Sequence, residues 1–182
     1  MTRIQANLLL LAVALIWGSA FVAQAHGTEH LGSFTFTGIR FLLGVCVVAP
    51  LALRDLRLIA RRTVKPAQRD MAGVLMLGLL LALGAVFQQI GITGTTVTNA
   101  GFLTALYVPL VPLISWLLMR SRPHWSVWPA SAGCLVGTWM LSGAGSLSLG
   151  VGDAWVIASS LFWALHVIFV GRVADRLAAP FL

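Results

Sequence analysis

Arg40 has the clearest chemical potential in this sequence, because it is a charged residue inside the apolar run 33–53. Placing an ionised side chain in the hydrocarbon core of a membrane costs about 3 kcal/mol on insertion scales, so such a residue normally faces protein or water. It lies about seven residues from the start of its run, which is roughly 10 Å along a helix. Two interpretations stay open: Arg40 binds an anionic group such as a carboxylate, or it reaches to the boundary and bonds backbone carbonyls.

Two prolines, Pro109 and Pro112, lie in the middle of the apolar run 98–119. Each lacks an N–H, so the carbonyl four residues earlier loses its helical partner. In hydrocarbon that carbonyl needs a substitute, and Thr104 and Tyr107 are nearby donors. The prolines therefore predict either a kinked helix that lines a solute pathway or a kink shaped only by packing.

Four further polar or aromatic residues are candidates for a solute pathway. Gln88 and Asn99 bracket the turn between the third and fourth runs, where they either contact a solute at the external mouth or cap helix ends. Trp17 and His166 lie within the first and sixth runs, where the indole could stack on a solute and the imidazole could exchange protons near neutral pH. The alternatives are a packed tryptophan and a hydrogen-bonded core imidazole.

Catalytic and metal chemistry receive little support. The segment 26–30 reads His-Gly-Thr-Glu-His and matches the H-x-x-E-H zinc pattern, but we expect it in a short external loop without a third ligand. Ser19, Ser115 and Ser142 have neither a nucleophile motif nor a catalytic carboxylate around them. We therefore expect no enzyme activity, no metal site and no cofactor.

The elements that must position these residues are long apolar helices. Of the 182 residues, 59% are apolar and 9% are charged, whereas a soluble domain carries roughly 25% charged residues. A helix of about 20 apolar residues crosses a bilayer. Six runs reach or approach that length: 6–25, 33–53, 71–92, 98–119, 125–143 and 151–171. The sequence thus predicts an all-α membrane protein, a polytopic bundle of transmembrane helices in a lipid bilayer.

The basic residues predict the orientation of the chain. Apart from Arg40, every lysine and arginine precedes the first run or follows an even-numbered run, and the other connections contain none. Cytoplasmic segments are enriched in Lys and Arg. We expect a multi-pass protein of the cell membrane with a cytoplasmic N-terminus, and this placement of the net charge of +7 argues against nucleic acid as a partner. A cleaved leader ending at 23–25 (Ala-Gln-Ala) is the alternative for the first run.

An internal repeat favours an uncleaved first helix. The segment 15–22 parallels 161–168, and the two runs that contain them cross in opposite directions. Such a relation is typical of inverted repeats in transporters. We expect a five-helix repeat over 6–143, and the first helix of an inverted second repeat, with a following loop, over 151–182.

Several short motifs carry a resemblance to a known family. In chain order they are Trp17-Gly18-Ser19, the aromatic and arginine pattern of 36–41, Gln89-Ile90-Gly91 with 98–103, the proline pattern of 107–112, and Gly133 with Gly137. In their order and spacing the chain resembles the EamA-like branch of the drug/metabolite transporter superfamily. That resemblance implies ten helices in two repeats, so we expect this sequence to be a fragment that stops after the sixth helix.

The resemblance also implies a function. It suggests a permease or exporter that moves small organic solutes, such as amino acids or metabolites, by alternating access. A non-transporting membrane subunit or an inactive fragment is the alternative. Gly133 and Gly137 form a G-x-x-x-G pair, which allows close helix packing within one chain or in a homodimer.

Overall fold

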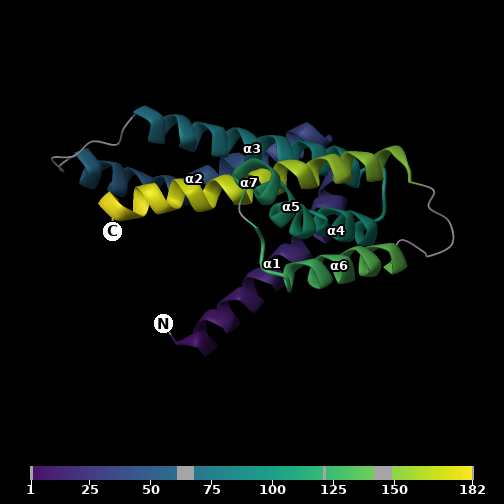
Figure 1. Ribbon diagram of the computed structural model, residues 1–182. Helices are drawn as coiled ribbons and strands as arrows, with labels where there is room; N and C mark the ends of the chain where they lie inside the picture. Colours follow the sequence, from purple (N-terminus) through teal and green to yellow (C-terminus); the bar gives the residue numbers. More distant parts are fainter. Residues whose placement is uncertain (1, 61–67, 121, 142–148, 182) are drawn as a thin grey trace.

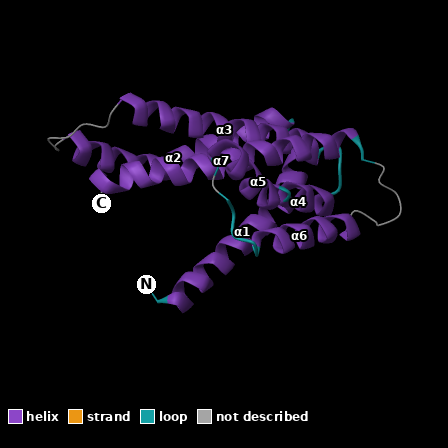
Figure 2. Ribbon diagram, viewed as in Figure 1, coloured by secondary structure: helices purple, strands orange, loops and turns teal. Residues whose placement is uncertain are grey.

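The structure is a computed structural model that describes residues 2–60, 68–120, 122–141 and 149–181. Within these ranges the chain is helical and contains no strand (Figure 2). The helices are α1 Arg3–His30, α2 Ser33–Ala60, α3 Gln68–Ile92, α4 Val97–Ala105, α5 Tyr107–Met119, α6 Val127–Leu141 and α7 Val151–Phe181. The prediction of an all-α polytopic membrane protein is confirmed, since five helical segments in the described part are long and apolar enough to span a bilayer.

The helices α1, α2 and α7 are longer than the apolar runs that predict them. The expected loop 54–70 is wrong at both ends, because α2 continues to Ala60 and α3 begins at Gln68. The expected loop after residue 171 is also helical as far as Phe181. Arg, Leu and Ala favour helix whether or not lipid surrounds them, so a helix can continue past the apolar boundary.

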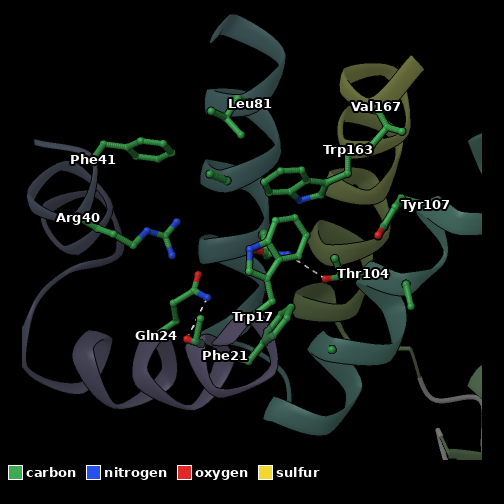
Figure 3. A pocket seen from close by; sticks show the side chains of 15 residues that line it. Trp17, Phe21, Gln24, Arg40, Phe41, Leu81, Thr104, Tyr107, Trp163 and Val167 are labelled. Atoms are coloured by element: carbon green, nitrogen blue, oxygen red, sulfur yellow. Dashed lines mark hydrogen bonds between the residues drawn. The ribbon is translucent and has the colours of Figure 1, made fainter. Parts of the chain in front are cut away.

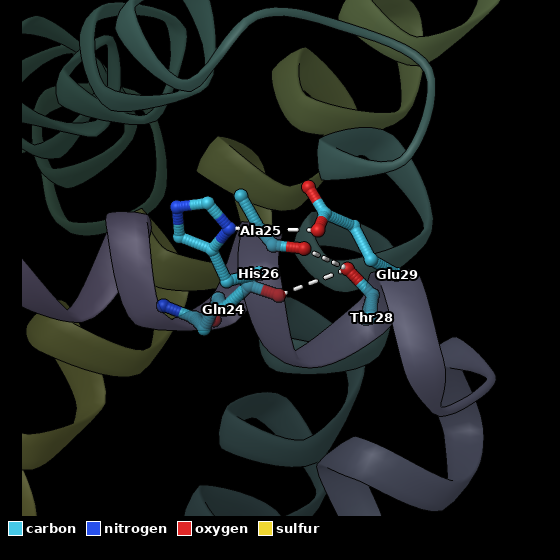
Figure 4. A network of polar contacts seen from close by, with 5 residues as sticks. All are labelled: Gln24, Ala25, His26, Thr28 and Glu29. Carbon is cyan, nitrogen blue, oxygen red and sulfur yellow. Dashed lines mark hydrogen bonds and ion pairs between the residues drawn. The ribbon is translucent and has the colours of Figure 1, made fainter.

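The ends of α1 show how local chemistry sets its length. Its first turn has a capping box, in which the Gln5 N–H donates to Thr2 Oγ1 at 3.3 Å and the Thr2 N–H donates to Gln5 Oε1 at 2.9 Å. At the other end, the expected external loop 26–32 is wrong, because the helix includes His30. The hydroxyl of Thr28 donates to the carbonyls of Gln24 and Ala25, both at 2.9 Å, which stabilises this last stretch (Figure 4).

The run predicted as one helix over 98–119 is divided into α4 and α5. The break is at Leu106, whose N–H donates to Leu103 O in a tight turn at 3.2 Å. Pro109 explains the position, because a proline clashes with the carbonyl four residues earlier, here that of Ala105. The two pieces still form one apolar span from Val97 to Leu118.

The helix α7 lies at the centre of the bundle. It packs along α3 over most of its length and also contacts α4 and α5, while α6 packs against α4 and α5 (Figure 1). A small apolar core of Ile92, Ala100, Leu103 and Val156 joins α3, α4 and α7. Large apolar side chains such as Leu117, 80% exposed, cover the outside. Such a surface suits lipid rather than water.

The backbones come very close together where α3 and the turn after it meet the start of α7. A Cβ added to Gly152 would lie 2.3 Å from the carbonyl carbon of Gly94, and one added to Gly91 would lie 2.8 Å from Gly152 O. Beside this crossing, the buried Asp153 accepts hydrogen bonds from the Thr95 hydroxyl and, at 2.9 Å, from the Gly150 N–H. The backbones therefore meet with no side chain between them.

Candidate functional site

A cavity of about 360 Å³ lies between α1, α2, α3, α4, α5 and α7 (Figure 3). Its walls are mainly apolar and aromatic, with a small number of polar groups, as in small-molecule sites generally. The lining residues are Trp17, Ala20, Phe21, Gln24, Arg40, Phe41, Leu81, Ala85, Gln88, Gly101, Thr104, Ala105, Tyr107, Trp163 and Val167.

The structure brings together some of the residues that the sequence suggested for a solute pathway. Those that line the cavity are Trp17, Arg40, Gln88, Thr104 and Tyr107. Those that do not line it are Asn99, Pro109, Pro112 and His166. The cavity therefore draws on the first four apolar runs and the sixth.

Arg40 brings a positive charge to the cavity from the second turn of α2. Its guanidinium carbon lies 5.5 Å from the ring centroid of Phe41 and 5.9 Å from that of Phe36. Within the described ranges, the guanidinium has no acidic partner within ion-pair distance. Aromatic faces attract a cation but do not neutralise it. Arg40 is thus a partly buried cation whose hydrogen-bond donors remain available to a ligand.

A polar bridge joins α3 to α4 in the cavity wall. Gln88 Nε2 donates to Thr104 Oγ1 at 3.0 Å, and the Thr104 hydroxyl donates to Ala100 O at 2.7 Å. Both side chains are buried, so Gln88 lies inside the bundle rather than at an exposed mouth. The bridge fixes the amide and leaves its oxygen as an acceptor near the cavity.

Two tryptophans, one from α1 and one from α7, form the aromatic wall. The rings of Trp17 in α1 and Trp163 in α7 have centroids 6.3 Å apart and are tilted by 53°. Trp163 reaches this position because α3 has a glycine opposite it: a Cβ on Gly84 would lie 3.3 Å from the indole. The segments 15–22 and 161–168, which we expected to be related by a repeat, are thus in contact through their tryptophans.

Gln24 is the most informative residue that sequence reasoning missed. It is 5% exposed, its Nε2 donates to Ala20 O at 3.0 Å, and its Oε1 is buried without a hydrogen-bond partner. A helical pattern could have found it, because Trp17, Phe21 and Gln24 are spaced four and three residues apart and so share one face. Its neutral amide gives little signal in a scan for charges.

The remaining predicted residues have other contacts. Asn99 lies in the first turn of α4, where its N–H donates to the N-cap Thr96 Oγ1 at 3.1 Å. His166 Nδ1 lies 3.0 Å from Leu77 O, which ties α7 to α3. Its ring also meets Trp163 edge-on, with centroids 6.3 Å apart. The histidine contact agrees with a hydrogen-bonded core imidazole, whereas the cap of α4 is Thr96 and not Asn99.

The carbonyl released by Pro109 is satisfied differently from the expectation. We expected Thr104 or Tyr107 to supply the donor, but the Thr104 hydroxyl donates to Ala100 O instead. The thiol of Cys134 in α6 points to Ala105 O at 3.9 Å. A thiol is a weak donor, so this carbonyl at the cavity wall is only partly compensated.

The H-x-x-E-H segment forms the last turn of α1 rather than a loop. His26 Nδ1 lies 3.5 Å from Glu29 Oε2, and both side chains are exposed (Figure 4). Within the described part of the chain, no three histidine, cysteine or acidic residues cluster in a way that could hold a metal ion.

Comparison with known proteins supports a transporter. The profile of the EamA-like transporter family matches residues 4–143, and the chain belongs to this family. An uncharacterized transporter of Archaeoglobus fulgidus is 29% identical over 178 residues, which are 98% of this chain and 52% of that protein. The uncharacterized inner membrane transporter YedA of Escherichia coli K12 is 27% identical over 170 residues, which are 90% of this chain and 52% of the length of YedA.

The chain spans about half the length of the curated relatives it matches. No solved structure gives a significant match. Family and relatives point to membrane transport rather than catalysis, and they name no solute.

Proposed function

We propose that this chain forms the substrate-binding part of a permease that moves small organic solutes, such as amino acids or other metabolites, by alternating access. The observation that carries the proposal is the cavity between α1, α2, α3, α4, α5 and α7, which has an apolar lining, one cation and a buried amide bridge. A volume of about 360 Å³ suits a small molecule, since such sites occupy roughly 300–1,000 Å³.

The arrangement of helices supports a mechanism by relative movement. The cavity lies where α7, the first helix of the expected second repeat, meets helices of the first repeat. Transporters with inverted repeats expose a central site to each side by rocking one group of helices against the other. We place the pivot of such a movement at Gly91, Gly94 and Gly152, where the backbones at the end of α3 and the start of α7 meet with no side chain between them.

The proposed orientation places the N-terminus in the cytoplasm of a cell-membrane protein. Arg3 at the start of α1 and the basic residues near the ends of α2, α5 and α7 would then share the cytoplasmic side. Reporter fusions after Leu31 and after Lys65 should report opposite compartments. Activity of both fusions in the same compartment would contradict this orientation.

Thiol labelling tests alternating access without knowledge of the solute. Ala85 is 1% exposed and lines the cavity, so Ala85→Cys in a background with Cys46→Ala and Cys134→Ala places one thiol in the site. A membrane-impermeant thiol reagent should modify it in intact cells and also in inverted vesicles. Leu117→Cys, on the lipid-facing surface, is the matched control and should resist modification from both sides.

The labelling result also separates the alternatives. Modification of Ala85→Cys from both sides supports transport through the cavity. Modification from one side only contradicts alternating access, and protection from both sides favours a membrane subunit that does not transport.

A further inference from the structure

We propose that the cavity selects a net monoanionic carboxylic acid that has a neutral hydrogen-bond donor, such as a hydroxyl, beside its carboxylate and a small aromatic body. This inference rests on the proposed transport function and narrows it to one charge class. It ranks such acids above zwitterionic amino acids, and it excludes organic cations.

The charge of the lining is the first reason. Among the residues around the cavity, all within the described ranges, Arg40 carries the one formal charge. Glu29, Asp70 and Asp153 are the acidic residues whose side chains the structure describes, and none of them lines the cavity. A buried charge needs a partner of opposite sign. A carboxylate on the solute supplies the negative partner for Arg40. An ammonium group on the solute would lie near the guanidinium, and no carboxylate among the lining residues could pair with it.

The orphaned oxygen of Gln24 is the second reason. The hydrogen bond from Nε2 to Ala20 O fixes the amide, so Oε1 is the end left free, and it is buried without a partner. Figure 3 shows the side chains of Gln24 and Arg40 extending toward one another from α1 and α2. An amide oxygen repels a carboxylate and accepts only from an N–H or O–H. The bound solute therefore carries a donor next to its anionic group.

The aromatic wall is the third reason. Trp17 and Trp163 lie 6.3 Å apart at a tilt of 53°, and Phe21 follows Trp17 by one helical turn on the same face of α1. Tilted and edge-on contacts between rings are favourable at such centroid separations. A planar body attached to the carboxylate would extend from Arg40 toward these rings within about 360 Å³.

Four probes with one phenyl-alkyl skeleton test the inference. They are 3-phenyllactate, which has a hydroxyl and a carboxylate; 3-phenylpropanoate, which lacks the hydroxyl; phenylalanine, which has an ammonium in its place; and 2-phenylethylamine, which is a cation. Each is titrated by calorimetry into the purified full chain in detergent. We expect 3-phenyllactate to bind most tightly and 3-phenylpropanoate to bind about 3- to 10-fold more weakly, the usual effect of one neutral hydrogen bond. Phenylalanine should be weaker still, and the amine should not bind.

Variants assign the selectivity to residues. Gln24→Met keeps the length of the side chain and removes the acceptor, so the two acids should then bind equally. Arg40→Gln should weaken both acids by at least about tenfold, as expected for a charged hydrogen bond. Arg172→Gln removes an exposed charge outside the cavity and should leave both affinities unchanged. Thermal melting of each variant checks that it is folded.

Several outcomes would overturn the inference. The first is that phenylalanine or the amine binds as tightly as 3-phenyllactate, and the second is that no probe binds. The third is that Gln24→Met weakens the binding of both acids equally, because Gln24 would then act only by orienting Arg40. The labelling of Ala85→Cys needs no solute. Two-sided labelling together with any of these outcomes would leave transport standing and remove the proposed charge class.

Discussion

The glycine crossing between α3 and α7 makes a quantitative prediction for Gly152→Ala. The new Cβ would lie 2.3 Å from the carbonyl carbon and 2.4 Å from the carbonyl oxygen of Gly94. Because carbon atoms in good contact are about 3.5 Å apart, the backbones must separate by roughly 1.2 Å. Overpacking of this kind costs about 1–3 kcal/mol, and the upper half of that range applies because the obstacle is backbone rather than a side chain that can rotate.

A thermal melt of the purified protein in detergent measures this cost. For a chain of this size each kcal/mol lowers the melting temperature by about 2–4 °C, so Gly152→Ala should melt about 4–12 °C lower than the parent. Gly171→Ala is the matched control in the same helix, because a Cβ there meets nothing within 4 Å. The control should melt at or slightly above the parent temperature, since alanine favours helix over glycine by up to about 1 kcal/mol.

The difference in melting temperature between the two variants tests whether the backbones are in contact at Gly152. A melting temperature for Gly152→Ala within about 2 °C of that of Gly171→Ala would show that α3 and α7 do not touch through their backbones. The close crossing, and the tilting motion proposed from it, would then be refuted.

Two other hydrogen-bonded contacts give predictions of similar form. Thr104→Val removes the hydrogen-bond partner of Gln88 in a buried wall, so the free energy of unfolding should fall by about 1–3 kcal/mol. Thr104→Ser keeps the hydroxyl and should retain most of that stability. Equal melting temperatures for the two variants would contradict the bridge. Asp153→Ala removes the acceptor for the Thr95 hydroxyl and should also lower the melting temperature. Asp153→Asn keeps one carbonyl acceptor and should lower the melting temperature less. The reverse order would exclude the Asp153 carboxylate as the group that joins Thr95 to α7.

The sequence allowed the helices to be predicted better than their ends. Hydropathy locates the apolar part of each span, and the long helices α1, α2 and α7 contain those parts. It does not report where a helix stops, because residues such as those of 54–60 are helix formers outside lipid as well. The helix α6 begins at Val127, two residues inside the expected run 125–143, and the last two residues of that run lie outside the described part of the chain.

The site could be predicted in part, and the errors have physical causes. Arg40 and Trp17 stood out because a charge and a large ring are unusual within their apolar runs, and both line the cavity. Gln24 escaped notice because it lies at the edge of the expected first span, where a polar residue needs no explanation. His166 lies within its span, but its imidazole is engaged by Leu77 O, although Trp163 and Val167 of the same helix line the cavity. Residue type alone does not report which side chains are already bonded to a neighbouring helix.

The break at Leu106 divides one crossing of the membrane into two short rods. A continuous helix resists bending because its ladder of hydrogen bonds must be strained, but here the ladder is already interrupted between α4 and α5. The rod α4 is anchored to the small core through Ala100 and Leu103, while α5 continues to Met119 beyond that anchor. A bend at Leu106 therefore costs fewer hydrogen bonds than a bend in a continuous helix. It would move α5 against α7 and change the shape of the cavity at Tyr107 while leaving the amide bridge at Thr104 in place.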